Sequence, residues 1–104
     1  MFVQMKTFVV KEGTSELVLN RFAGQNKLAE QPGFIDRTIL KKNVRRGDEE
    51  VILYVRWESE ADWKNWEKHP DHIAGHKANI GKPKPDHIIE SSQSTYHVHP
   101  VSNA

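Results

Sequence analysis

The fold of this chain is decided by the stretch Glu50-Val51-Ile52-Leu53-Tyr54-Val55-Arg56-Trp57-Glu58-Ser59 in the middle of the sequence. β-Branched and aromatic side chains recur there with a period of two, which predicts a strand that is buried mainly on one face. The side chains expected to point inward are Val51, Leu53, Val55 and Trp57, with Ile52 and Tyr54 partly buried on the other face. Ser59 then caps a helix that carries Glu60 and Asp62 near its positive end. The stretch therefore predicts a strand that leads directly into a helix.

The sequence before this strand predicts two further strands and a helix. The first ten residues alternate, with one face formed by Phe2, Gln4, Lys6 and Phe8 and the other by Val3, Met5, Thr7 and Val9. A turn at Gly13 leads into a helix that is expected to run to about Lys27 or Leu28. Pro32-Gly33 stops this segment, and Phe34 to Lys41 reads as the second strand.

The sequence after the central strand completes the fold. Pro70 interrupts the second helix, Asp71 can cap a continuation to about Ile80, and a last strand falls between His87 and His99. The order β-α-β-β-α-β predicts a ferredoxin-like α+β fold in a single domain, residues 1–104. The helices cover one face of its antiparallel sheet. Burial of the other face against a second copy of the chain predicts a homodimer.

The composition excludes several classes of function. Among 104 residues, 15 Lys and Arg are interleaved with 14 Asp and Glu for a net charge of +1, so we expect no nucleic acid partner. The absence of cysteine excludes disulfides, thiolate metal sites and thiol nucleophiles. The amino terminus lacks the pattern of a secretion signal, and no apolar run has the length of a membrane helix. We therefore expect a cytoplasmic protein without a membrane partner.

The candidate functional residues lie between Trp63 and Lys77, where two tryptophans and three histidines fall within fifteen residues. The most telling pair is Trp66 and His76, ten residues apart on either side of a proline break. A bulky flat indole and an imidazole that meet in one cavity are what a large planar ligand with a metal centre needs.

Two other interpretations of the histidines stay open on spacing alone. His76 shares a helical face with Ile73 and Ile80, which also suits a hydrogen-bonded core histidine. His72 and His76 form an i, i+4 pair that can chelate zinc. Against a three-histidine site, the proline break separates His69 from this pair, and no nearby glutamate stands in a zinc-protease arrangement.

A family resemblance rests on Val55-Arg56-Trp57-Glu58-Ser59, followed by Trp66 and Gly75-His76-Lys77. Further features follow in the same order over nearly the whole chain, namely Gly13, Arg21-Phe22 and Pro32-Gly33-Phe34. In these motifs the chain resembles the IsdG-type haem-degrading monooxygenases of the antibiotic-biosynthesis-monooxygenase superfamily, and most closely their HmoA-like members.

The resemblance implies an enzyme that binds haem as both substrate and cofactor and cleaves the porphyrin oxidatively, with release of iron. Such an enzyme uses O₂ and electrons from an external reductase or small reductant, and no flavin is expected. The resemblance also implies a homodimer whose two sheets form a shared α+β barrel, with one haem pocket per subunit. His76 would be the axial ligand of the iron, Trp66 would press on the porphyrin and ruffle it, and Phe22 would form a further wall of the pocket.

The chain departs from the family on the distal side of the implied site. The family usually has an asparagine in the first strand, where this chain has Lys6, and Gln4 is the nearest amide on the same strand face. Either Gln4 or Lys6 replaces that hydrogen-bond donor, or the distal chemistry differs. The propionates need cations or exposure to water, and Lys77 or the Lys82/Lys84 loop are the candidate cations.

Two alternative functions keep the same fold. One is oxidation of an aromatic or quinol substrate without any cofactor, as in other antibiotic-biosynthesis-type monooxygenases. The other is haem binding or buffering without turnover.

Overall fold

The computed structural model describes residues 1–24, 27–82 and 84–101. In this part of the chain the elements are β1 (Phe2–Val10), α1 (Ser15–Phe22), the 3₁₀ helix η1 (Lys27–Glu30), β2 (Phe34–Lys41), β3 (Glu49–Trp57), α2 (Glu60–Glu67), α3 (Pro70–Asn79) and β4 (Ile88–His97). The predicted order is confirmed, with the second helical segment divided into α2 and α3 at Pro70.

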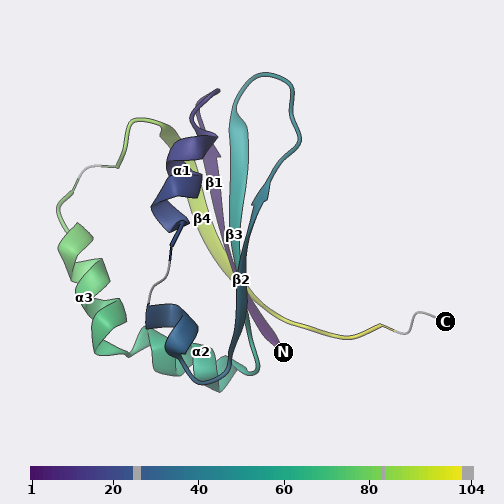
Figure 1. Cartoon of the computed structure of the whole chain (residues 1–104), viewed down its shortest axis with the longest axis vertical. Helices are drawn as coiled ribbons and strands as arrows, with labels where there is room; N and C mark the ends of the chain where they lie inside the picture. Colours follow the sequence, from purple (N-terminus) through teal and green to yellow (C-terminus); the bar gives the residue numbers. More distant parts are fainter. Residues whose placement is uncertain (25–26, 83, 102–104) are drawn as a thin grey trace.

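The four strands form one antiparallel sheet in the order β2-β3-β1-β4. All the helices lie on the same side of this sheet, as Figure 1 shows. The sheet is open, with β2 and β4 at its edges. The prediction of a ferredoxin-like α+β fold is confirmed. The dimeric barrel and the single domain over residues 1–104 stay predictions.

Two groups of apolar side chains form the core between the sheet and the helices. One group is Phe2, Leu28, Leu53, Val55 and Trp57. The other is Phe8, Val10, Val18, Val51 and Ile88. The predicted inward face of β3 is therefore confirmed. On β1, Gln4 and Lys6 lie on the same face as Phe2 and Phe8, since side chains alternate along a strand. Two polar residues thus separate the two apolar groups.

Helix α1 ends earlier than the sequence predicts, at Phe22 instead of Lys27 or Leu28. Arg37 on β2 explains this, because its guanidinium donates to the carbonyls of Phe22 at 3.0 Å and Gly24 at 2.8 Å. Ala23 is extended, and Gly24 has a positive φ of 94°. A distant arginine thus takes up the carbonyls at the helix end, where Gly24 supplies the backbone conformation. Of the remaining predicted helical positions, 25–26 lie outside the described residues, and Lys27 and Leu28 belong to the separate 3₁₀ helix η1.

The cap of α3 also differs from the prediction. His69, not Asp71, precedes the helix, and its Nδ1 accepts a hydrogen bond from the backbone N–H of Asp71 at 3.1 Å. Pro70 occupies the first helical turn, where its fixed φ suits a helix start and no donor is lost. The proline therefore begins α3 and does not merely interrupt the preceding helix.

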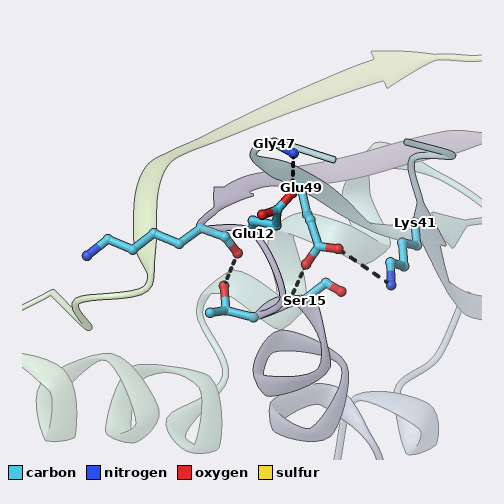
Figure 2. Close-up of polar contacts among 7 residues, drawn as sticks. Glu12, Ser15, Lys41, Gly47 and Glu49 are labelled. Carbon is cyan, nitrogen blue, oxygen red and sulfur yellow. Dashed lines mark hydrogen bonds and ion pairs between the residues drawn. The ribbon is translucent and has the colours of Figure 1, made fainter. Parts of the chain in front are cut away.

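Two carboxylates tie the β2–β3 hairpin to the start of α1 (Figure 2). Glu49 accepts a hydrogen bond from the backbone N–H of Ser15 at 3.0 Å, and Glu12 accepts one from that of Gly47 at 2.5 Å. The Ser15 hydrogen bond holds the pKa of Glu49 below its usual range, with the Lys41 ammonium adding to the effect. These contacts set the position of α1 over the sheet.

None of the helices within the described residues combines the length and the apolar character that crossing a bilayer requires.

Candidate functional site

Gln4 and Lys6 on β1 border a group of cavities between the sheet and the helices. The largest, of about 540 Å³, is bounded by Lys6, Trp66, His72 and His76. A second of about 140 Å³ reaches deeper, to Gln4 and further residues of the core. A third of about 370 Å³ extends from Lys6 towards β4. The largest cavity lies in the range of about 300–1,000 Å³ that is typical of small-molecule sites.

Helices α2 and α3 supply the aromatic and imidazole wall of the largest cavity. Trp66 is half-buried at the end of α2, and its ring lies 5.4 Å from that of His69 and 5.0 Å from that of His72. His76 follows one turn after His72 on α3 and is exposed. Ile73 and Ile80 are also exposed, at 40% and 76%. His76 is therefore not a core histidine, and its ring is available to a ligand.

Strand β1 supplies the opposite wall through Gln4 and Lys6. Gln4 is 7% exposed and lines the deeper cavity. Burial lowers the pKa of Lys6, and the charge of Arg21 lowers it further, while the carboxylate of Glu67 acts in the opposite direction. A ligand in the cavity would meet an amide and an amine from this side, and both can donate hydrogen bonds.

Two cations that the sequence analysis did not single out as ligands lie on the rim of the largest cavity. They are Arg21 at the end of α1 and Lys27 at the start of η1. The proposed alternatives Lys77, Lys82 and Lys84 line none of the three cavities, and Lys84 instead donates to the carbonyl of Ile89 at 2.7 Å. Arg21 belongs to the Arg21-Phe22 motif, so its position in the sequence was a usable signal. The sequence gives no such signal for Lys27, because it predicts a continuous helix at this position.

The structure brings the predicted site residues to the same group of cavities. Trp66 lines two of them, His76 the largest, and Gln4 the deepest, where Phe22 is also found. Lys6 lines all three. The arrangement suits a flat molecule with anionic groups at one edge, while the role of each residue stays a prediction.

The histidines do not form a three-histidine cluster. The ring of His69 caps α3, whereas Glu67 takes its place beside the other two. Glu67 Oε2 lies 2.8 Å from His72 Nε2, which in turn lies 3.0 Å from His76 Nε2. Burial lowers the pKa of His72, an effect that the Glu67 carboxylate opposes.

The chain matches a known protein family, and a member of it over nearly its whole length. The family described as antibiotic biosynthesis monooxygenase matches residues 1–78. The Bacillus subtilis (strain 168) protein named heme-degrading monooxygenase HmoA is 56% identical over 101 residues, which cover 97% of this chain and 94% of the relative.

Solved structures agree with the sequence matches. A Bacillus cereus protein whose crystal structure carries the same family description is 50% identical, with a TM-score of 0.85 over 99% of this chain and 95% of that one. The heme-degrader MhuD from Mycobacterium tuberculosis shares the fold at 20% identity, with a TM-score of 0.65 over 99% of this chain and 100% of that one. The chain therefore belongs to the antibiotic biosynthesis monooxygenase family.

Proposed function

We propose that this protein is a haem-degrading monooxygenase that binds haem through His76 and cleaves the porphyrin oxidatively, with release of iron. The observation that carries the proposal is the cavity of about 540 Å³ bounded by an exposed imidazole, an indole and the three basic side chains Lys6, Arg21 and Lys27. The relative at 56% identity, named heme-degrading monooxygenase, supports it.

The residues around the cavity fit a haem group. Gly75 borders the cavity one residue before His76, and a Cβ placed on it would meet nothing within 4 Å, so a flat ring can approach α3 there. Arg21 and Lys27 can pair with the two propionates. Neutral imidazole is a common axial ligand of haem iron, and His76 is accessible for this role.

Haem supplies the iron at which O₂ is activated, with electrons from an external reductase or small reductant and without a flavin. The protein holds and shapes the ring. Trp66 is a rigid side chain packed against the core, so it can press on a porphyrin that is held at His76. Such contact would favour a bent porphyrin over a flat one and so promote its oxidation. Lys6 and Gln4 are the candidate donors on the strand side.

We also propose that the protein acts in the cytoplasm as a homodimer. The sheet face opposite the helices carries Tyr54 next to Met5 and Thr38, and Ile52 next to Thr7 and Leu40. Leu40 and Tyr96, which also lies on this face, are 47% and 49% exposed. A second copy would cover these apolar side chains and give the shared barrel. Sedimentation should show a dimer, and a monomer at micromolar concentration would contradict it.

A haem titration tests the function. The purified protein should give a Soret band that saturates at one haem per chain, and His76→Ala should change the position of the band or abolish it. His99→Ala, an exposed histidine outside the cavities, is the matched control and should behave as the wild type. An unchanged spectrum in His76→Ala would refute the axial assignment. No Soret shift in the wild type would favour the cofactor-independent oxidation of an aromatic or quinol substrate.

A further inference from the structure

Three metal-ligating side chains converge where α2 meets α3. Glu67 is the last residue of α2, His72 lies in the first turn of α3, and His76 follows one turn later. Their ligand atoms all lie within 4.8 Å of one another. The turn at Pro70 brings the carboxylate of one helix to the imidazoles of the next.

One full hydrogen bond from His72 Nε2 serves only one of its two close neighbours. His72 Nε2 faces both Glu67 Oε2, at 2.8 Å, and His76 Nε2, at 3.0 Å. An imidazole nitrogen carries either a proton or a lone pair in its plane, so it serves one of the two contacts. If His72 Nε2 donates to Glu67, it has no lone pair for His76. If it accepts from His76, it donates no hydrogen bond to the carboxylate.

A cation at the centre resolves this conflict, because all three atoms can then present lone pairs. Two ligands that are each about 2.1 Å from a metal and at right angles are about 3.0 Å apart, or about 3.4 Å apart at the tetrahedral angle. The two separations in the structure, 2.8 Å and 3.0 Å, are close to the right-angle value. Two histidines and one carboxylate are a ligand set for Fe²⁺ and Zn²⁺.

The surroundings hold two of the ligands in place. The side chain of His72 is 13% exposed and that of Glu67 is 31% exposed. The His72 ring packs edge-on against Trp66 at 5.0 Å, which restricts its rotation. His76 faces the largest cavity, from which an ion and its remaining water ligands can enter. Lys6, Arg21 and Lys27 line the same cavity and oppose a cation, so we expect weaker binding than at a site without these charges.

We propose that Glu67, His72 and His76 form a binding site for a divalent transition-metal ion in the haem-free protein. The site does not depend on haem, but it shares His76 with the proposed haem site, so an ion and haem should exclude one another. The further assignment of the natural ion as Fe²⁺ released from haem rests on the proposed function. In that case, opening of the porphyrin ring would free the iron next to Glu67, His72 and His76, which can bind it.

Calorimetric titration of untagged, haem-free protein with Zn²⁺ and Co²⁺ tests the site. We expect one ion per chain and at least a tenfold loss of affinity in Glu67→Gln and in His72→Ala. Glu60→Gln is the matched control, since Glu60 lies on the same helix but pairs with Lys64 at 3.2 Å outside the cluster. Wild-type affinity in Glu67→Gln and His72→Ala, with their thermal unfolding unchanged, would overturn the proposal, as would the absence of a one-to-one site.

A haem titration of Glu67→Gln separates this proposal from the proposed function. Glu67 is not an expected haem ligand, so this variant should keep the Soret band while it loses the ion. Prior addition of one equivalent of Zn²⁺ should slow haem uptake by the wild type at least several-fold and leave uptake by Glu67→Gln unaffected. Equal uptake with and without Zn²⁺, in protein shown to hold the ion, would contradict a shared His76.

Discussion

Replacement of Trp66 by phenylalanine separates the chemical role of this side chain from its role in packing. Trp66 is half-buried, packs against the core group that contains Phe2 and Trp57, and lines two cavities of the site. Phenylalanine keeps an aromatic ring at the same position but removes the second ring of the indole. The change therefore shortens the surface that can press on a bound porphyrin.

The cost in stability should be small. The lost ring removes roughly 40 Å² of apolar surface, of which about half is buried here, and at about 25 cal/mol per Å² this amounts to about 0.5 kcal/mol of unfolding free energy. Trp66→Ala should cost about 2 kcal/mol, half of the loss that is typical for a fully buried tryptophan. Urea denaturation measures both values. We expect Trp66→Phe to stay folded and to bind haem in the same ratio as the wild type.

Turnover should suffer more than stability. If Trp66 bends the ring, its replacement by phenylalanine should slow haem degradation about tenfold, equivalent to about 1.4 kcal/mol of activation free energy. The assay follows the Soret absorbance under air with ascorbate and catalase. Trp63→Phe is the matched control, because Trp63 lies one turn earlier on α2, packs on Phe2 at 5.2 Å and lines none of the three cavities. Equal rates for Trp66→Phe and the wild type would refute the reasoning.

Three further substitutions test the site and the fold. Lys6→Met should slow turnover, and it should raise the free energy of unfolding at pH 7 because burial lowers the pKa of Lys6 and so disfavours its charged form in the folded state. This gain in unfolding free energy should shrink as the pH rises towards 10.5. A gain that does not change with pH would contradict an origin in the Lys6 charge. Glu49→Gln should lower the free energy of unfolding above about pH 4.5, because the pKa of this carboxylate is lowered in the folded state. The difference from the wild type should disappear in acid, where the carboxylate becomes protonated. A difference in urea denaturation that does not change with pH would contradict this prediction. Gly33→Ala should lower the free energy of unfolding by about 2–3 kcal/mol, since φ is +82° and a Cβ would overlap the side chain of Asp62. Gly13→Ala, at φ +78° with open space around it, should lower it by about 1–2 kcal/mol. Equal losses of stability in the two variants would exclude a contribution from the overlap with Asp62.

Most of the sheet could be predicted from the sequence because its signal is local. The alternation from Val51 to Trp57 is set by the core beneath it, and the observed burial follows the same period. The end of α1 could not be predicted in this way. It depends on Arg37, which lies on a strand fifteen residues after Phe22 and takes up the carbonyls at the helix end. Helical spacing carries no information about such a distant donor.

The candidate site could be predicted in part. Trp66 and His76 were identified by their type and by the resemblance, and both line the largest cavity. The pairing of Glu67 with His72 at 2.8 Å was missed, because the two residues belong to different helices and meet only through the turn at Pro70. Helical periodicity relates residues within one helix, so it cannot predict a contact between residues on either side of such a turn. Lys27 was missed for a related reason, since a continuous helix was expected there.

Iron release in a single turnover tests the central claim most directly. The protein is loaded with one equivalent of haem, ascorbate is added under air with catalase present, and chelatable Fe²⁺ is measured together with the Soret absorbance. A haem-degrading monooxygenase should lose the Soret band and release about one iron per haem, and His76→Ala should do neither at a comparable rate. A Soret band that persists in the wild type, with no chelatable iron, would contradict the account and indicate a protein that binds haem without degrading it.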